Sequence, residues 1–201
     1  MHKSVIVVED FYANPLEVRE AALAAGFPEH RGPRTFPGRN SAQPILVPQL
    51  DQAVSTLLGE ALHGKSVGGS FHGYCRSTLA GEEGRYLVHA DPSSLWWVGV
   101  CYLTLPEHCQ GGTTFFRHRG LGLDRTPTRQ EEIEAVGCAG VAELLARDGG
   151  DPAAWETLMT LPMRFNRAVF YRPWLWHTAG PGFGDAPENG RLVQVFSFER
   201  A

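Results

Sequence analysis

The stretch RYLVHADPSSLWWVGVCYLT, residues 85–104, contains the pattern that decides the fold. Residues 85–90 and 96–104 are rich in aromatic and β-branched side chains, and a polar turn that contains Pro92 separates them. Short segments of this kind, bounded by Pro, Ser, Asp or Gly, are typical of β-strands. The stretch therefore predicts two strands joined by a turn, with His89 and Asp91 where the first strand ends.

The same texture continues on both sides of this stretch. Asn14 and Pro15 are typical of a helix start, and apolar residues at helical spacing predict helices at 14–26 and 47–61. Many short strands with turn signals indicate an antiparallel sandwich or barrel. We expect a single, mainly β domain over residues 1–201, with N-terminal helices. Its further strands are predicted at 4–9, 70–79, 113–118, 167–171, 174–178 and 191–199.

One segment departs from this texture. Residues 120–160 differ in composition, and apolar residues at helical spacing between 128 and 147 predict a helix there. We interpret 120–160 as a helical insertion between two strands, because the segment is too small to close a core of its own. Long excursions from such a scaffold are usually functional, so we expect this insertion to act as a lid or a wall of a substrate site.

The composition excludes several classes of protein. The chain has 201 residues, 43% of them hydrophobic and 20% charged, which is typical of a globular protein. A net charge of −4 argues against dedicated nucleic-acid binding. No apolar run reaches the roughly 20 residues of a membrane helix, residues 1–10 lack the pattern of a signal peptide, and the four cysteines match no disulfide or zinc pattern. We therefore expect a cytoplasmic protein without a membrane segment.

His89 and Asp91 are the first candidates for a chemical site. Residues i and i+2 of a strand point to the same side, so both side chains can reach one metal ion. Two histidines and one carboxylate on one face form the facial triad that binds non-haem iron(II) and leaves other coordination positions open. The H-x-D spacing is common by chance, however, and on its own it also fits a strand end without any chemistry.

Further motifs accompany this pair in a definite order. They are Tyr86 three residues before His89, Y-L-T at 102–104, G-G-T-T-F-F at 111–116, N-R-A-V-F-Y at 166–171, W-H-T at 176–178, and Arg191 at the start of the last predicted strand. With this order, over residues 86–198, the chain resembles the 2-oxoglutarate/iron(II)-dependent dioxygenase superfamily, in particular its prolyl-hydroxylase-like branch. The resemblance implies a double-stranded β-helix, a jelly roll of eight core strands.

The resemblance also implies a role for each motif. His89, Asp91 and His177 would hold Fe(II). Arg191 would pair with the distal carboxylate of 2-oxoglutarate, and Tyr102 would donate its hydroxyl to the same group. A buried carboxylate needs a charged partner that also donates hydrogen bonds, and a guanidinium supplies both. The implied activity is an oxygenase reaction, in which oxidative decarboxylation of the 2-oxo acid drives attack on a substrate C–H bond, as in hydroxylation.

The sequence leaves two residue assignments open, namely the basic residue that binds 2-oxoglutarate and the role of Tyr86. Arg191 lies 14 residues after His177, which is further than is usual in this superfamily, and Arg172 is the rival basic residue. Tyr86 is either a core aromatic residue of its strand or a residue that contacts the cosubstrate.

The function keeps alternatives as well. A cupin-like metal protein without a 2-oxo acid, or a non-catalytic binding or regulatory module, would use the same fold. Arg191 and Tyr102 discriminate between these readings, because only the 2-oxoglutarate reading needs both near the metal. The substrate is left open among peptides, amino acids and small metabolites, with His72 and Arg76 as candidate contacts. The oligomeric state is left open too.

Overall fold

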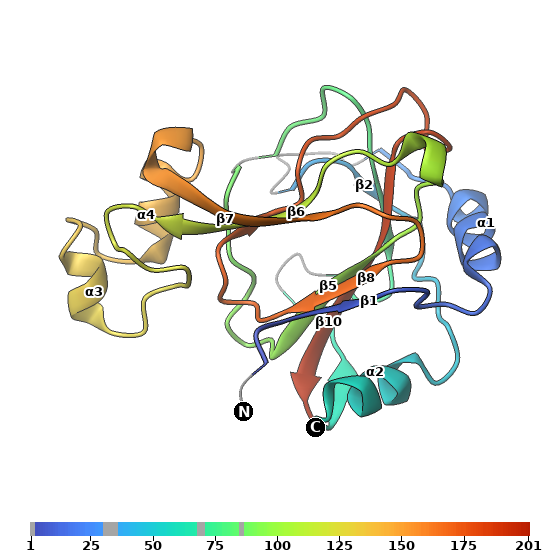
Figure 1. Ribbon diagram of the computed structural model, residues 1–201, viewed down its shortest axis with the longest axis horizontal. Coiled ribbons are helices and arrows are strands. Elements are labelled where there is room, and N and C mark those ends of the chain that lie inside the picture. Colours follow the sequence, from blue (N-terminus) through green and yellow to red (C-terminus); the bar gives the residue numbers. More distant parts are fainter. Residues whose placement is uncertain (1–2, 30–35, 68–70, 85–86) are drawn as a thin grey trace.

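The computed structural model describes residues 3–29, 36–67, 71–84 and 87–201, in which helices accompany two antiparallel sheets (Figure 1). One sheet has seven strands in the order β1-β8-β5-β10-β4-β2, with β3 paired to β10. Its strands are β1 (Val5–Val8), β2 (Arg39–Asn40), β3 (Leu62–Gly64), β4 (Cys75–Thr78), β5 (Trp97–Tyr102), β8 (Ala168–Tyr171) and β10 (Arg191–Arg200). The other sheet has three strands in the order β7-β6-β9, namely β6 (Gly112–His118), β7 (Trp155–Pro162) and β9 (His177–Thr178).

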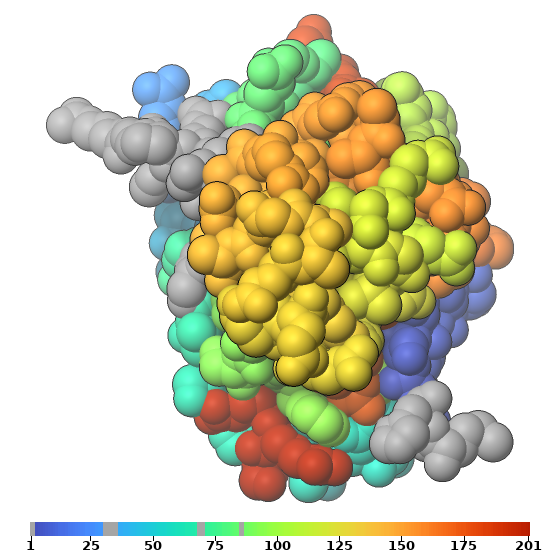
Figure 2. Space-filling view, turned by 90° about the vertical axis from the view of Figure 1, so that its left-hand side faces the viewer, coloured from blue at the N-terminus to red at the C-terminus, as the bar shows by residue number. Residues whose placement is uncertain are grey.

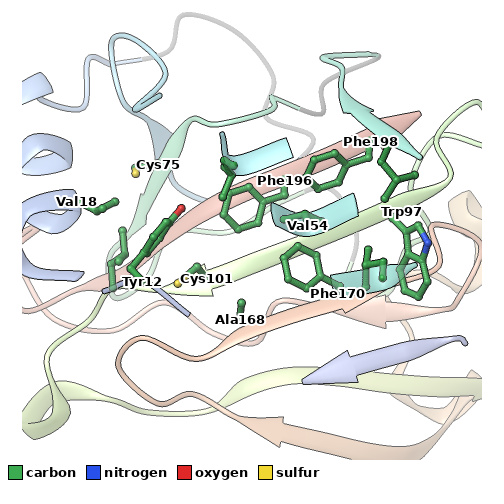
Figure 3. Close-up of a cluster of buried hydrophobic side chains, with 14 of the residues drawn as sticks. Tyr12, Val18, Val54, Cys75, Trp97, Cys101, Ala168, Phe170, Phe196 and Phe198 are labelled. Atoms are coloured by element: carbon green, nitrogen blue, oxygen red, sulfur yellow. The ribbon is translucent and has the colours of Figure 1, made fainter. Parts of the chain in front are cut away.

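The outer face of the seven-stranded sheet packs against α1 (Pro15–Ala25) and α2 (Leu50–Leu58). Figure 3 shows the rings of Phe170, Phe196 and Phe198 gathered with Val54 of α2, and these side chains are fully buried. Large aromatic side chains contribute most to such a core because each one removes a large apolar area from water. The two N-terminal helices that the sequence predicts are therefore confirmed, and their role is to cover this face.

The inner face of the same sheet looks toward the three-stranded sheet. Val98, Tyr171 and Val193 come from three neighbouring strands and share one buried cluster with Phe115 of β6. Successive side chains of a strand point to opposite faces, so each central strand supplies both the outer core and this inner space. The inner space holds the candidate site.

A helical segment connects β6 to β7. It contains α3 (Gln130–Glu134), α4 (Val141–Asp148) and a short 3₁₀ turn (Pro152–Ala154), and it lies at one end of the molecule, where it covers the face seen in Figure 2. Ile133, Leu144, Trp155 and Trp176 form a buried cluster between these helices and the three-stranded sheet. The helices form the outer cover of this sheet, and Gly150, which follows α4, lines the cavity between the sheets. The expected role of the segment as a lid or substrate wall stays a prediction.

The structure also corrects the bounds of the expected insertion. Residues 155–162 form β7, which pairs with β6 along its length, so the helical part ends before the predicted limit at residue 160. The predicted strand at 174–178 is reduced to His177–Thr178. Residues 172–176 instead bond to loops, since the Leu175 N–H bonds to the Arg172 carbonyl and the Trp176 N–H to the Asp124 carbonyl. Among the described residues, no helix is long and apolar enough to cross a membrane.

Candidate metal centre

His89, Asp91 and His177 come together between the two sheets. His177 begins β9, and His89 pairs with it through an isolated antiparallel bridge. The predicted strand at 85–90 is wrong over the described residues 87–90, where this bridge is the only strand-like pairing. The ligand atoms of the three side chains all lie within 4.8 Å of one another. Nε2 of His177 is 3.4 Å from Oδ2 of Asp91, and the two imidazole centroids are 4.3 Å apart. Among the residues described, this is the one cluster of His, Cys, Asp or Glu side chains close enough to share a metal ion.

Hydrogen bonds to backbone carbonyls position Asp91 and His177. The Asp91 N–H donates to the Pro173 carbonyl oxygen at 2.8 Å, which ties the H-x-D turn to the chain that leads into β9. Nδ1 of His177 donates to the Leu175 carbonyl oxygen at 2.8 Å. A carbonyl only accepts, so this bond leaves the lone pair on Nε2, the atom that faces Asp91. Support of this kind is what orients metal-binding histidines in proteins.

The electrostatics of the cluster favour a cation. Burial, together with the neighbouring His177 and Arg76, lowers the pKa of His89 well below its usual range, so its imidazole is neutral near neutral pH. Burial raises the pKa of Asp91, although His177 and Arg76 oppose this shift. The neutral imidazole of His89 and a buried carboxylate that has little contact with water are suited to a divalent metal, which would offset the charge of Asp91.

A cavity of about 530 Å³ opens from this cluster and is lined by residues of both sheets. Arg191 and Arg76 line it from the seven-stranded sheet, and Thr113 lines it from β6. Cavities of this size are typical of small-molecule sites. The metal cluster and two guanidinium groups therefore share one enclosed space.

Arg191 is the most unusual side chain of the cavity. It is only 2% exposed, and its Nε and Nη2 have no hydrogen-bond partner among the described residues. Burial lowers the pKa of Arg191, whereas the nearby Tyr102 and Tyr171 oppose the shift. A buried guanidinium with unsatisfied donors costs free energy unless an anion pairs with it. Arg191 thus fits a carboxylate ligand.

Tyr102 lies beside Arg191 but does not itself line the cavity. Its hydroxyl shares a hydrogen bond of 2.7 Å with Oγ1 of Thr113, whose side chain belongs to the lining. Burial raises the pKa of Tyr102, and the nearby Arg191 opposes this rise. The phenol is therefore neutral and can act as a donor. Its role toward a cosubstrate stays a prediction, with Thr113 added as its partner.

The rival Arg172 is used elsewhere. Its Nη2 pairs with Oε1 of Glu60 at 2.7 Å, its Nε and Nη1 donate to the backbone carbonyls of Lys3 and Trp96, and its guanidinium lies over the ring of Trp97. Arg172 does not line the cavity, so the geometry favours Arg191 as the basic residue for a ligand.

Of the remaining residues that the sequence suggested for the site, the structure places only one at the cavity. Tyr86 lies outside the described residues. His72 faces away from the cavity, since its Nδ1 bonds to the Ser197 carbonyl oxygen at 2.8 Å and its Nε2 lies 3.2 Å from Asp51. Arg76, in contrast, lines the cavity. The two differ because β4 begins only at Cys75, so the predicted alternation over 70–79 does not extend to His72.

Sequence reasoning missed Tyr171. Its ring lies 4.6 Å from the ring of His177, and its side chain lines the cavity. The available signal was the alternation in A-V-F-Y at 168–171. Phe170 points to the helix-covered core, and Tyr171 must then point to the other face.

The solved structures that resemble this chain include non-haem enzymes that depend on a 2-oxo acid. The chain is similar to the α-ketoglutarate-dependent carbocyclase SnoK from nogalamycin biosynthesis, at 16% identity and a TM-score of 0.56 over 99% of this chain and 80% of that one. It is also similar to the epimerase SnoN, at 15% identity and a TM-score of 0.52 over 98% and 78%. HygX from Streptomyces hygroscopicus, solved with nickel and 2-oxoglutarate, matches at 14% identity and a TM-score of 0.54 over 98% and 83%.

These similarities define a fold class. The chain has the fold of 2-oxoglutarate-dependent oxygenases, the double-stranded β-helix, with a possible His-Asp-His metal triad at the expected place. Within that class the chain belongs to DUF6445, a family of unknown function whose model matches residues 1–197. No curated protein matches the sequence.

Proposed function

We propose that the protein is a non-haem iron(II)- and 2-oxoglutarate-dependent oxygenase that oxidises a C–H bond of a small molecule, an amino acid or a peptide, most simply by hydroxylation. The observation that carries the proposal is one cavity that contains both the His89, Asp91 and His177 cluster and the unpaired, buried Arg191. The first feature suits a metal, and the second suits the carboxylate of a bound acid.

The residues fit both implied groups. His89, Asp91 and His177 would hold the iron on one face, which leaves the remaining coordination positions free for other ligands. When bound, iron(II) together with the 2-oxo acid supplies activation of oxygen coupled to oxidative decarboxylation. Arg191 would bind the distal carboxylate of the acid through Nε and Nη2, the two donors that the fold leaves unsatisfied.

The other residues of the cavity would position and shield the reaction. The hydroxyl pair of Tyr102 and Thr113 offers a hydrogen-bond donor close to Arg191. The ring of Tyr171 lies against His177, and the ring of Phe36 lies 4.8 Å from that of His89, so aromatic groups limit the water around the triad. A dry site strengthens the attraction between the guanidinium and the acid.

The prolyl-hydroxylase-like resemblance of the motifs also supports an oxygenase, and it keeps peptide side chains among the candidate substrates. A cupin-like metal protein would not need a buried arginine with free donors in the metal cavity. A binding or regulatory module would not need the complete triad. Both alternatives therefore leave part of the cavity without a purpose.

Turnover of 2-oxoglutarate tests the proposal directly. The protein is loaded with iron(II) under nitrogen, mixed with 2-oxoglutarate and candidate substrates, and exposed to air while succinate is measured. We expect succinate to form from 2-oxoglutarate with the wild-type chain and not with His89→Ala. His63→Ala is the matched control, because His63 is an exposed histidine that pairs with Glu199 on the surface. If the iron-loaded protein neither binds nor consumes 2-oxoglutarate, the proposal fails and the cupin-like alternative replaces it.

A further inference from the structure

A second guanidinium, that of Arg76, lines the cavity and has no role in the reaction as proposed. Arg76 lies on β4 opposite Val193 of β10, two positions along that strand from Arg191. Its Nε donates to Oδ1 of Asn40 at 2.8 Å, and the part of the chain that the structure describes offers no hydrogen bond to its two Nη nitrogens. The outer edge of this guanidinium is therefore free to bind a ligand.

Arg76 lies close enough to the metal cluster for its charge to act on both His89 and Asp91. Arg76 is half-buried whereas Arg191 is sealed, and its guanidinium lies 5.3 Å from the ring of Phe36 at the edge of the cavity. A 2-oxo acid that reached from the metal to Arg191 would occupy the deep part, so Arg76 faces the part left for the substrate.

The formal charges of the cavity leave one positive charge without a partner. A divalent metal and two guanidinium groups bring four positive charges, the Asp91 carboxylate removes one, and a 2-oxoglutarate dianion removes two more, which leaves one uncompensated. Glu82 faces Arg39 in an ion pair at 3.3 Å, so it does not supply the balance. Glu83 is exposed at the rim, where water screens its charge. One further anionic group completes the cavity.

We infer that Arg76 binds a carboxylate of the primary substrate, so the enzyme acts on small organic acids. A single carboxylate balances the remaining charge, whereas a phosphate dianion would leave an excess negative charge. A planar carboxylate also matches the edge of a guanidinium that presents two N–H groups side by side. The inference rests on the proposed function in one respect, because it reserves Arg191 for the 2-oxo acid.

Matched pairs of acids and amides test this inference without turnover. The protein is loaded with manganese(II) and saturating 2-oxoglutarate under nitrogen. It is then titrated calorimetrically with acetate, butanoate, benzoate and 3-phenylpropanoate, and with their primary amides. Each pair differs by one charge at nearly constant shape. We expect at least one acid to bind about tenfold or more tightly than its amide, since a hydrogen bond to a charged group is worth that much.

Variants then locate the preference. Arg76→Gln should abolish the difference between acid and amide, and Arg76→Lys should keep part of it because the charge remains. Both should bind 2-oxoglutarate within about threefold of wild type, in contrast to Arg191→Met, because they leave its distal partner in place. Arg117→Gln is the matched control, since Arg117 is exposed on β6 and pairs with Glu156 outside the cavity.

Two kinds of result would overturn the assignment of Arg76. One is an equal affinity of the wild-type chain for acids and amides, or no binding of any acid in the panel. The other is a loss of 2-oxoglutarate affinity in Arg76→Gln as large as in Arg191→Met, which would make Arg76 a partner of the cosubstrate. Failure of the wild-type chain to bind 2-oxoglutarate is a separate outcome that contradicts the proposed function. An acid preference lost in Arg76→Gln alone would still assign Arg76 in that case.

Discussion

His89 and His177 exchange two backbone hydrogen bonds. The His89 N–H donates to the His177 carbonyl oxygen at 3.0 Å, and the His177 N–H donates to the His89 carbonyl oxygen at 2.9 Å. Because β9 is also paired with β6, backbone bonds hold the two histidines together although they are far apart in the sequence. We therefore expect the metal-free protein to be folded, with the two histidines already side by side.

Removal of a metal ligand should reduce metal affinity without unfolding the chain. We expect His89→Ala and Asp91→Ala to keep their backbone bonds and their thermal stability. Mutation of a residue that only hydrogen-bonds to a metal ligand lowers metal affinity by roughly 10–100-fold, and loss of a ligand itself should lower it further. Asp91→Ala should have at least as large an effect as His89→Ala, because it also removes the negative charge. Anaerobic titration with iron(II) or manganese(II) measures this, and unchanged affinity in both variants would refute the metal assignment.

Arg191→Met should separate stability from ligand binding. Without a ligand, the variant should be more stable than wild type by about 1–3 kcal/mol, because it removes buried donors that have no partner. It should bind metal normally and lose about 3–5 kcal/mol of 2-oxoglutarate binding, a factor of a few hundred to a few thousand. Urea unfolding and calorimetry measure the two effects.

Arg172→Met is the contrasting variant. It breaks the ion pair with Glu60, so it should destabilise the protein and leave 2-oxoglutarate affinity unchanged. The opposite pattern in these two variants would mean that Arg172 is the cosubstrate residue.

Tyr102→Phe should weaken 2-oxoglutarate binding modestly. One neutral donor is lost, worth roughly 0.5–1.5 kcal/mol, or about two- to tenfold in affinity. If the hydroxyl acts on the same carboxylate as Arg191, the effect should vanish in the Arg191→Met background. Calorimetry on the four proteins of this double-mutant cycle provides the measurement. Equal effects in both backgrounds would show that Tyr102 acts only through the packing of Thr113.

Glu60 should make stability depend on pH. Burial acts to raise the pKa of Glu60, but hydrogen bonds from Trp96, Trp97 and Arg172 outweigh it and hold the pKa below 4.5. A carboxylate with a lowered folded-state pKa stabilises the protein above pH 4.5, and this contribution is lost as the pH falls through the folded-state value. Glu60→Gln should therefore cost about 1 kcal/mol at pH 7, and this cost should shrink as the pH is lowered below 4.5. Urea unfolding over a series of pH values measures it, and a cost that does not change with pH would exclude this electrostatic role.

The helical segment should contribute to stability. Leu144 is fully buried between α4 and the three-stranded sheet, so Leu144→Ala should lower the free energy of unfolding by about 2–5 kcal/mol. Leu158→Ala on β7 is the matched control, because Leu158 is 40% exposed and should lose little. Similar small losses in both variants would show that the segment adds little to stability and would favour the expected role as a lid.

Much of the site was predictable because its chemistry depends on short, local patterns. The H-x-D spacing and the distal histidine are visible in the sequence, and their order relative to Arg191 carries the resemblance. The choice between Arg191 and Arg172 was not decidable at that level. It depends on Glu60 and on Trp97, which occupy Arg172 from distant parts of the chain.

The fold was less predictable where a segment's neighbours decide its conformation. W-E-T-L-M-T-L-P at 155–162 lies close after two helices and the G-G-D-P turn at 149–152, and its strand character comes from pairing with β6. Arg76 and His72 show the same limit within one predicted strand. Only the observed start of β4 tells which of the two faces the cavity.

Strand β10 divides two tasks between its alternate residues. Leu192 and Phe198 belong to the helix-covered core, whereas Arg191, Val193 and Val195 line the cavity. Substitutions at 191, 193 and 195 should therefore change the cavity and leave the helix-covered core in place. A deletion of one residue in the strand would instead exchange the two sets at once and lose both tasks together. Chemical diversification along this strand is thus open to point substitution and closed to small insertions or deletions.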